Sequence, residues 1–360
     1  MTKKTVIVDM SGGVDSSTAC FLLQREGYRV IGVTLKLWES QCDDSVFNKK
    51  SCCGADDLTD ARKIASQLKI PYYVLNCEKE FKDNIIEHFC DEYLKGRTPS
   101  PCILCNQKIK FDVLLRRAQK EFKADYIATG HYAQIVYNKI NKEYELHKGH
   151  DKDKDQSYFL WGLTQRIMPY LLFPIGKYNK SEIRKIALDA GLVVASKKES
   201  QEICFIPDGN YGKFLLNYKK IKTIPGNIID VDGKHLGTHQ GLHFYTIGQR
   251  KGLGISSPSP LYVISIDLHG NILVVGKEKS LYNNRLIAEN IIWCTEKPFE
   301  EPITIKAKIR SRGPEADAML HPHGRDKAEL FFLSSQRAIT SGQAVVFYDK
   351  SKVIGGGWII

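Results

Sequence analysis

The stretch Ser11-Gly12-Gly13-Val14-Asp15-Ser16-Ser17 joins an apolar run at residues 6–8 to a helix-like segment at residues 19–23. A strand, a glycine turn and a helix start together present backbone N–H groups and hydroxyls that can bind an anion. The glycines lack a Cβ, so the backbone can approach a phosphate closely. Neither the Gly-Lys-Ser/Thr of the common P-loop nor Gly-x-Gly-x-x-Gly is present at the required spacing. We therefore predict a phosphate site of another kind, with an ordinary strand-to-helix turn as the alternative.

Strand-like and helix-like segments alternate through the first two hundred residues. Apolar strand-like runs occur at residues 6–8, 30–35, 72–75 and 126–128, and apolar residues recur at helical spacing in 57–68, 79–94 and 111–122. This alternation predicts an α/β domain with a doubly wound parallel sheet. Ligands of such sheets bind at the carboxyl ends of the strands. We expect one pocket there to collect the Ser11 loop, the segment after Leu35 and residues 129–132.

The pattern changes after residue 205. Turn signals such as Pro225-Gly226-Asn227 and Asp232-Gly233-Lys234 separate short β-rich runs, and the pattern gives no long amphipathic helix. This part is predicted to be all-β. Turn-rich segments at 248–254 and 280–284 divide it further. We predict a first domain at 1–205, a small β-rich central domain at 206–280 and a C-terminal β-barrel at 281–360.

The composition is that of an ordinary folded protein, with 42% hydrophobic and 26% charged residues in a chain of 360. Its apolar runs are far shorter than the ~20 residues of a membrane span, and the first residues do not resemble a signal peptide. We therefore expect a cytoplasmic protein with no membrane partner. The net charge of +11 favours a polyanion such as tRNA as partner. A generally lysine-rich composition is the alternative.

Ten cysteines in a reducing compartment are available for metal binding or catalysis. Cys102 and Cys105 follow a proline-rich loop at Cys-x-x-Cys spacing. Such a pair can share a metal, form a disulfide or gain thiolate character at a helix N-terminus. A third cysteine, Cys204, lies far along the chain, and the sequence does not fix whether the three meet. Others lie in or beside apolar patterns and are predicted to be buried structural thiols: Cys20, Cys77, Cys90 and Cys294.

The order Ser-Gly-Gly-x-Asp-Ser resembles the PP-loop of ATP pyrophosphatases, which split ATP between its α and β phosphates. Six further segments follow along almost the whole chain: 96–106, 128–132, 154–160, 203–206, 225–226 and 245–254, the last containing Tyr-Thr-Ile-Gly-Gln-Arg-Lys-Gly-Leu-Gly. In this order they resemble the bacterial tRNA-specific 2-thiouridylase family. The resemblance implies that 1–205 is a PP-loop catalytic domain and that the central domain binds tRNA.

The resemblance also implies a reaction, the 2-thiolation of the wobble uridine (position 34) of tRNA. ATP with Mg²⁺ adenylates the C2 oxygen, which makes it a good leaving group, and a cysteine persulfide then delivers sulfur to C2 as AMP departs. By the resemblance, Cys105 is the first catalytic cysteine and Cys204 carries the persulfide. The two would then pair as a disulfide that a reductant resets. A persulfide sulfur-donor protein is the implied second partner.

Other residues match positions with roles in the family. The matching ATP-binding positions are Asp9, Met10, Ser11, Gly12, Gly13, Val14, Asp15, Ser16, Leu35 and Gly130. The matching tRNA-binding positions are Ser100, Pro101, Cys102, His131, Lys154, Asp155, Gln156, Arg310, Ser311 and Gln343. Asp15 orients Mg²⁺ or caps the helix. Ser311 stands where the family often has tyrosine, so stacking by that ring is lost.

Cys102 stands where the family has an aspartate that is a candidate general acid or base. A thiol has a higher reference pKa and is a poor substitute in that role. With Cys105 and Cys204, Cys102 would instead give three thiolates for an iron–sulfur cluster. The persulfide route is preferred, and the cluster stays open as the alternative.

The target base must leave its stack to be modified. Tyr132, Tyr158 and Phe159 are candidate stacking partners, or else core aromatics. Cys42, Cys52 and Cys53 receive no function. Two rival functions remain: an ATP pyrophosphatase acting on a small molecule, which needs no cysteine pair, and a non-catalytic RNA-binding protein, which needs no phosphate loop.

Overall fold

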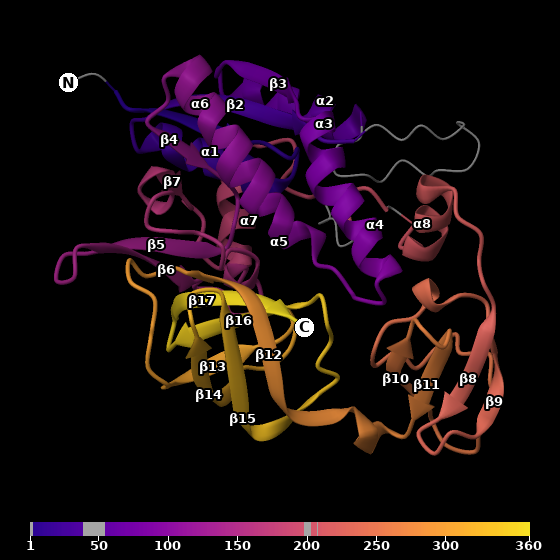
Figure 1. Cartoon of the computed structure of the whole chain (residues 1–360). Helices are drawn as coiled ribbons and strands as arrows, with labels where there is room; N and C mark the ends of the chain where they lie inside the picture. The colour runs from indigo at the N-terminus through magenta and orange to yellow at the C-terminus, as the bar shows by residue number, and fades with distance from the viewer. Residues whose placement is uncertain (1–2, 39–54, 198–202, 207) are drawn as a thin grey trace.

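The computed structural model describes residues 3–38, 55–197, 203–206 and 208–360 (Figure 1). Cys42, Cys52 and Cys53 lie outside the described residues. The N-terminal part is built on a sheet in the order β3-β2-β1-β4-β7, with parallel pairing throughout. Its strands are β1 (Thr5–Asp9), β2 (Arg29–Lys36), β3 (Tyr72–Asn76), β4 (Tyr126–Ala128) and β7 (Leu171–Leu172). The predicted parallel sheet is therefore confirmed.

Helices cover both faces of this sheet, because successive residues of β1 point to opposite sides. Val6 and Val8 share a core with α1 (Val14–Arg25), α2 (Ala55–Gln67) and α7 (Lys180–Asp189). Ile7 belongs to the core of the opposite face. That face is covered by α3 (Glu78–Phe81), η1 (Lys82–Ile86) and α4 (Glu87–Leu94), and then by α5 (Pro101–Cys105), η2 (Asn106–Leu114) and α6 (Leu115–Phe122). The segments η1 and η2 are π-helical and continue directly into α4 and α6.

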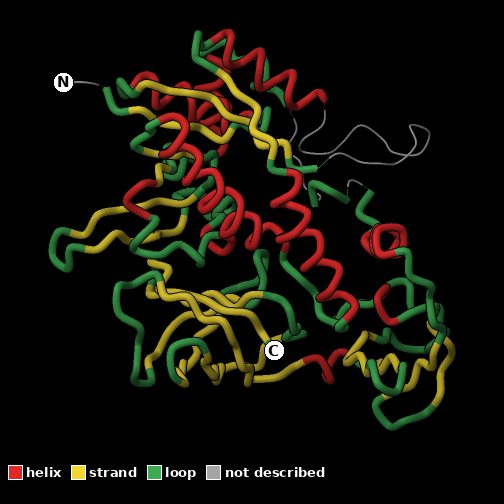
Figure 2. The backbone as a smooth tube through the Cα atoms, turned by 45° about the horizontal axis from the view of Figure 1, so that its top comes forward, coloured by secondary structure: helices red, strands yellow, loops and turns green. Residues whose placement is uncertain are grey.

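The central part contains a sheet in the order β10-β11-β8-β9. Its strands are β8 (Gly226–Asp230), β9 (His235–His239), β10 (Tyr262–Asp267) and β11 (Ile272–Gly276). The short 3₁₀ turns η5 (Leu242–Phe244) and η6 (Glu278–Leu281) flank these strands. Figure 2 shows this sheet as a group of strands separate from the C-terminal strands, with the long helices gathered on the N-terminal part.

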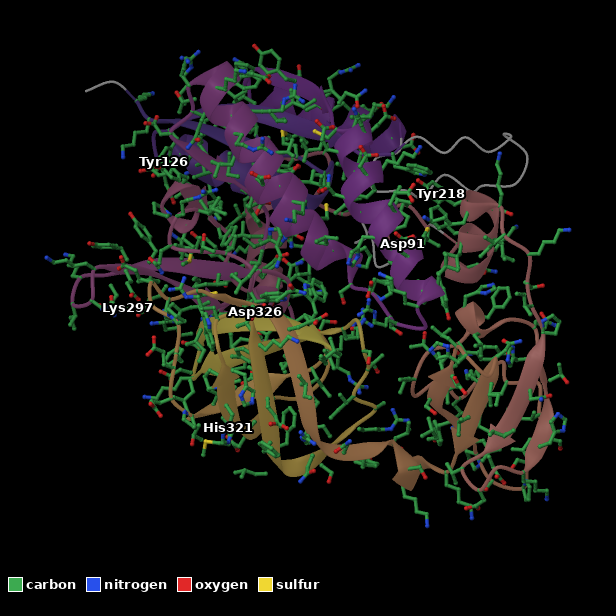
Figure 3. The ribbon with its side chains drawn as sticks, in the orientation of Figure 1. Asp91, Tyr126, Tyr218, Lys297, His321 and Asp326 are labelled. Atoms are coloured by element: carbon green, nitrogen blue, oxygen red, sulfur yellow. The ribbon has the colours of Figure 1, made fainter. Side chains whose placement is uncertain are left out.

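An all-β structure after residue 205 is wrong, because α8 (Tyr211–Lys219) begins the central part. Tyr211, Phe214 and Tyr218 pack against the core beneath α4. The Tyr218 hydroxyl donates to Glu87 at 2.6 Å, and Lys219 pairs with Asp91 at 2.8 Å. Figure 3 labels Tyr218 and Asp91 on these neighbouring helices. The apolar spacing was present in the sequence, but tertiary packing stabilises this short helix.

The C-terminal part is an antiparallel barrel closed by pairing between its first and last strands. Its strands are β12 (Tyr282–Trp293), β13 (Ile303–Lys308), β14 (Ala316–His323), β15 (Lys327–Arg337), β16 (Ala344–Asp349) and β17 (Lys352–Ile359). A hairpin from the N-terminal part, β5 (Ala133–Asn138) and β6 (Glu143–Lys148), extends this sheet because β6 pairs with β17. The turns η3 (Ser157–Phe159) and η4 (Met168–Tyr170) follow the hairpin.

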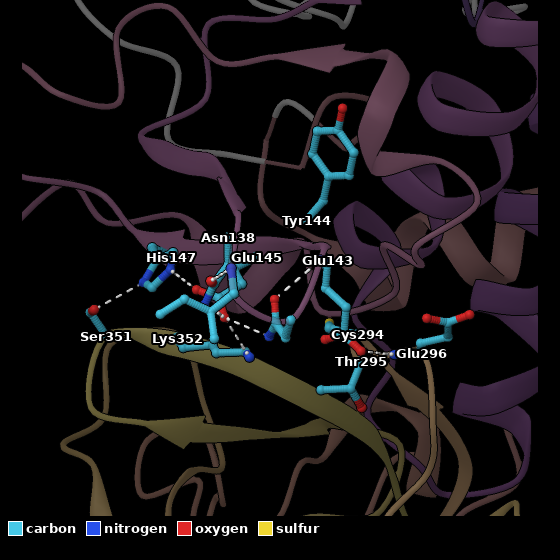
Figure 4. A network of polar contacts seen from close by, with 12 residues as sticks. Asn138, Glu143, Tyr144, Glu145, His147, Cys294, Thr295, Glu296, Ser351 and Lys352 are labelled. Atoms are coloured by element: carbon cyan, nitrogen blue, oxygen red, sulfur yellow. Dashed lines mark hydrogen bonds and ion pairs between the residues drawn. The ribbon is translucent and has the colours of Figure 1, made fainter.

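Polar contacts fasten the hairpin to the barrel (Figure 4). The Glu145 carboxylate accepts hydrogen bonds from Lys352 at 2.8 Å and Asn138 at 3.1 Å, and lies 3.0 Å from His147 Nε2. Burial opposes the charge, yet these bonds lower the pKa of Glu145 to about 2. Gln165 donates to the backbone carbonyls of Tyr144 and Cys294, each at 2.6 Å. The N-terminal part and the barrel thus share a sheet and a hydrogen-bond network.

The thiols predicted to be structural are buried: Cys20, Cys77, Cys90 and Cys294. Burial raises the pKa of Cys90 and Cys294 to about 12. These groups stay protonated and act as small apolar side chains. In the described ranges, no helix combines the length and the apolar character needed to cross a bilayer.

Candidate active site

The predicted phosphate loop, residues 11–17, joins β1 to the first turn of α1, and its two glycines have different constraints. Gly12 has φ +69°, and a Cβ there would lie 2.3 Å from the carbonyl oxygen of Asp57. Only glycine fits this position without a backbone shift. Gly13 has φ −97° and forms the N-cap of α1. The nearest atom to a Cβ on Gly13 would be Ser11 Oγ, at 3.5 Å. Gly12 thus shapes the loop, whereas Gly13 leaves room beside the helix N-terminus.

Hydroxyl groups close the loop on itself. Ser16 Oγ accepts from the Ser11 backbone N–H at 3.2 Å, and Ser17 Oγ donates to the Gly13 carbonyl at 2.8 Å. The side chains of Met10 and Leu35 are buried in the core. A Cβ on Gly130 would lie 2.7 Å from the Ser16 backbone nitrogen. The structure therefore brings together the Ser11 loop and the segment at 129–132, two of the three segments expected in one pocket.

Asp15 faces a lysine that the sequence did not single out. Lys180 Nζ lies 2.8 and 2.9 Å from the two Asp15 carboxylate oxygens, and the Tyr132 hydroxyl donates to Asp15 at 2.8 Å. The N-cap residue, Gly13, receives no side-chain capping bond. Asp15 therefore holds a partly buried ion pair here and does not cap α1.

A second lysine, Lys197, contacts both the loop and the neighbouring helix α2. Its Nζ donates to the Gly12 carbonyl at 3.0 Å and pairs with Asp57 at 2.7 Å and Asp60 at 2.6 Å. Burial opposes the charge, but the two carboxylates raise the pKa of Lys197 above its ordinary value. Lys197 therefore joins the loop to the start of α2 as a permanent cation.

A third lysine, Lys110 on η2, connects the loop to the cysteines. Its Nζ lies 3.5 Å from Asp9 Oδ2 at the end of β1. Burial opposes its charge, yet Asp9, Cys105 and Cys102 raise the pKa of Lys110 above its ordinary value. His131 has the opposite shift, because burial and the neighbouring Lys110 charge lower its pKa well below the usual range. Thr129 Oγ1 lies 2.6 Å from His131 Nδ1. At neutral pH this corner of the site holds an ammonium and a neutral imidazole.

The cysteines predicted to be catalytic occupy different environments. Cys102 is exposed on the first turn of α5, whereas Cys105 is buried at its end. Cys204 is partly exposed and packs against the same core that contains Cys105. Within the described ranges, no three His, Cys, Asp or Glu side chains gather in a group that would hold a metal ion. The three cysteines thus do not form a cluster site in this conformation.

Comparisons with known proteins decide the family. Three family descriptions match successive regions: tRNA methyl transferase HUP domain at 4–208, tRNA methyl transferase PRC-barrel domain at 212–277 and aminomethyltransferase beta-barrel domain at 283–359. The chain is 48% identical over 354 residues to tRNA-specific 2-thiouridylase MnmA 1 of Caldanaerobacter subterraneus subsp. tengcongensis, which covers 98% of this chain and 97% of that one. The chain belongs to the tRNA-specific 2-thiouridylase family.

A second relative in this 2-thiouridylase family matches the chain from end to end. It is tRNA-specific 2-thiouridylase MnmA of Acetivibrio thermocellus, 46% identical over 359 residues and 100% of both chains. Among solved structures, a 4-thiouridine synthetase–RNA complex with bound ATP has 17% identity and a TM-score of 0.36, covering 55% of this chain and 43% of that chain.

Several positions that the 2-thiouridylase family resemblance assigns to tRNA make intramolecular bonds here. Asp155 accepts from the backbone N–H groups of Gly149 and Ser157, at 3.0 and 3.1 Å. Gln156 Oε1 accepts from the Tyr132 backbone N–H at 2.9 Å. These two side chains therefore organise their own loop.

The barrel contributes further contacts from this set. Arg310 donates to the carbonyls of Arg337 and Ala338. Gln343 donates to the carbonyl of Thr98 at 2.8 Å and so supports the loop before Cys102. Of the other residues in this set, Pro101 is buried, whereas Ser100, Lys154 and Ser311 are partly exposed.

The candidate stacking residues lie mostly in the core. Tyr132 and Tyr158 are 2% and 1% exposed, and the Tyr158 hydroxyl donates to the Ala344 carbonyl at 2.8 Å. Phe159 is partly buried and packs edge-on against Tyr158. In this conformation the two tyrosines act as core aromatics.

Proposed function

We propose that this chain catalyses the ATP-dependent 2-thiolation of the wobble uridine of tRNA. The observation that carries the proposal is the placement of Lys110 between Asp9, which precedes the phosphate loop, and the Cys102–Cys105 helix. This placement supports an activating phosphate site and a sulfur-transfer site that adjoin each other. The full-length similarity to tRNA-specific 2-thiouridylases supports this function.

The first step activates the base. The uridine O2 attacks the α-phosphorus of ATP, the bond from that phosphorus to the β-phosphate oxygen breaks, and pyrophosphate leaves with the electron pair. The N3 proton is lost as O2 becomes the adenylate oxygen. The Gly13 side of the loop, at the N-terminus of α1, is where the β- and γ-phosphates would bind. Mg²⁺ bound to the phosphates would offset their charge near Asp15.

The second step transfers sulfur. The terminal sulfur of a persulfide on Cys204 attacks C2, and AMP leaves with the electron pair of the C2–O bond. The Cys105 thiolate then attacks Cys204 Sγ, and the pair of the broken S–S bond goes to the sulfur on C2. This yields 2-thiouridine, which regains a proton at N3, and a Cys105–Cys204 disulfide. A thiol reductant resets the cysteines, and a persulfide donor protein reloads Cys204.

The cluster route is a second candidate because Cys102, Cys105 and Cys204 offer three thiolates. Analysis of iron and sulfide in anaerobically purified protein, with thiolation assayed before and after metal removal, tests it. Iron and sulfide at cluster stoichiometry with activity lost on removal supports the cluster. Full activity of metal-free protein excludes it.

Methyl transfer, named in two of the matched descriptions, requires neither a phosphate loop nor a cysteine pair. A small-molecule pyrophosphatase would leave the cysteines without a role. A non-catalytic RNA-binding protein would leave the loop unused. The proposed domains, a catalytic 1–205, a tRNA-binding 206–280 and a barrel at 281–360, suit a large polyanionic substrate, as does the net charge of +11.

The deciding experiment is thiolation of tRNA with ATP and a persulfide donor, read as 2-thiouridine by mass spectrometry and as AMP released. Cys204→Ser and Cys105→Ser should abolish 2-thiouridine. The control is Cys294→Ala, which removes a buried thiol of the barrel and should leave thiolation intact. Full thiolation by Cys204→Ser would overturn the mechanism.

A further inference from the structure

The lysines around the phosphate loop differ in how tightly their ammonium groups are engaged. Lys180 lies 2.8 and 2.9 Å from the Asp15 oxygens, and Lys197 lies 2.7 and 2.6 Å from Asp57 and Asp60. These are the distances of strong charge-assisted hydrogen bonds. Both groups are therefore committed to carboxylates of the protein.

Lys110 is engaged much more loosely. In the described part of the chain, the carboxylate within ion-pair distance of its Nζ is Asp9, at 3.5 Å. A hydrogen bond at that length is weak, and an ammonium has three protons to donate. Lys110, which also interacts with Cys105 and Cys102, can therefore accept an additional anion without first breaking a short carboxylate pair.

The backbone fixes where this ammonium lies. Lys110 follows Cys105 by five residues, and η2 is π-helical over Asn106–Leu114. A π-helix repeats its hydrogen bonds from i to i+5, so residue 110 lies one turn beyond residue 105 on the same side. Asp9, at the other end of the contact, ends β1 directly before the loop. The side chain of Lys110 thus reaches from the helical segment that follows Cys105 to Asp9, two residues before Ser11.

We infer that Lys110 binds the α-phosphate of the nucleotide and acts as a catalytic residue in both steps. This inference rests on the proposed function. If the loop holds the β- and γ-phosphates and Cys105 lies beside the target C2, the α-phosphate of the adenylate must lie between them, where the Lys110 ammonium is. There the ammonium would offset negative charge on the α-phosphate as pyrophosphate leaves in the first step, and as AMP leaves in the second.

Lys110 supplies positive charge to this corner, opposite the Asp9 carboxylate. Its pKa is raised, so it is an ammonium at neutral pH, whereas His131 is neutral because its pKa is lowered. Lys108, on the same helix, is exposed to solvent and forms a matched control.

Nucleotide binding tests this inference without any thiolation assay. Calorimetry on the full chain would compare AMP, ATP and adenosine for Lys110→Met, Lys110→Arg and Lys108→Met. Lys110→Met should weaken the binding of AMP and of ATP by similar factors, about tenfold or more, since each nucleotide loses one charge-assisted hydrogen bond. Adenosine affinity should not change, Lys110→Arg should retain part of the AMP affinity, and Lys108→Met should match the wild type.

Wild-type AMP affinity in Lys110→Met would overturn the inference, and so would an equal loss for adenosine. A second measurement avoids substitution. Acetylation of lysines in the wild-type protein, quantified by mass spectrometry, should show AMP protecting Lys110 and not Lys108. Equal acetylation of Lys110 with and without AMP would contradict the phosphate contact.

These results separate the two proposals. Loss of AMP binding in Lys110→Met, together with a chain that fails to thiolate tRNA, would keep the phosphate contact and reject the function. Thiolation by the wild type, with unchanged AMP binding in Lys110→Met, would keep the function and reject the contact.

Discussion

Gln343 of the barrel donates a hydrogen bond from Nε2 to the carbonyl oxygen of Thr98 at 2.8 Å, and the Thr98 backbone N–H in turn donates to the Ser341 carbonyl at 2.9 Å. A Cβ on Gly342 would lie 2.9 Å from the Thr98 nitrogen, so the two segments touch at the backbone. The barrel therefore positions the loop that leads into Cys102 and Cys105.

Gln343→Ala should lower the rate of thiolation clearly and the free energy of unfolding only slightly. The loss of one hydrogen bond costs about 1 kcal/mol of unfolding free energy, whereas a displaced cysteine loop lowers the rate of sulfur transfer several-fold. Nucleotide binding should not change. Single-turnover thiolation, thermal unfolding and ATP calorimetry would be compared with Gln336→Ala, a partly exposed position on β15 whose side chain bonds to Ser334 of the same strand. Equal thiolation rates in both variants would show that the contact does not position the cysteines.

The two loop glycines should respond differently to alanine. Gly12→Ala forces a Cβ against the Asp57 carbonyl and strains a positive φ, so we expect a loss of about 2 kcal/mol or more and a lower melting temperature. Gly13→Ala should fold normally and bind ATP at least tenfold more weakly, because its Cβ would enter the space kept for phosphate. Thermal unfolding and calorimetry separate these effects. A Gly13→Ala variant with wild-type ATP affinity would place the phosphates elsewhere.

Lys197→Met should raise the KM for ATP. The substitution leaves Asp57 and Asp60 without their cation and releases the Gly12 carbonyl, so the loop loses its link to α2. Lys197→Arg should retain much of the wild-type KM because it keeps the charge. Steady-state kinetics at saturating tRNA give the measurement, with Lys185→Met on α7 as a control. An unchanged KM in Lys197→Met would mean that the loop keeps its shape without this ion pair.

The lowered pKa of Glu145 predicts how the free energy of unfolding depends on pH. Its pKa is about 2 in the folded protein, below the ordinary 4.5. The stabilisation is therefore present above pH 4.5 and is lost as the pH falls from 4.5 through 2. Between pH 6 and pH 3 the wild type should lose about 2 kcal/mol more unfolding free energy than Glu145→Gln. Urea unfolding at the two pH values measures this difference, and parallel losses in both proteins would refute the assignment.

The sequence could predict the glycine turn between β1 and α1 and the parallel sheet because both depend on local patterns. Apolar runs such as residues 6–8 identify the strands, and the glycines identify the turn. The lysines of the site have no such pattern. Lys180 lies 165 residues from Asp15 and Lys197 lies 140 residues from Asp57, so only the fold brings them together. The Gln343–Thr98 contact joins residues 245 apart in the sequence, so no local pattern could have predicted it either.

The sequence also could not show which intramolecular contacts the residues at tRNA-matching positions make. Asp155 and Gln156 matched tRNA contacts by motif, yet their hydrogen bonds close their own loop. Helix α8 was missed because its apolar spacing extends over only nine residues, too few to form a stable helix without packing on α4.

The pairing of β6 with β17 has a consequence for synthesis. The ribosome completes β6 at Lys148 and must add about two hundred further residues before β17 emerges. Until then, the outer edge of the β5–β6 hairpin exposes unpaired backbone groups, and such an edge invites association between nascent chains. A chain truncated before Lys352 would keep that edge permanently open. The barrel therefore also protects the domain made first, and its late synthesis sets the interval during which that edge stays unpaired.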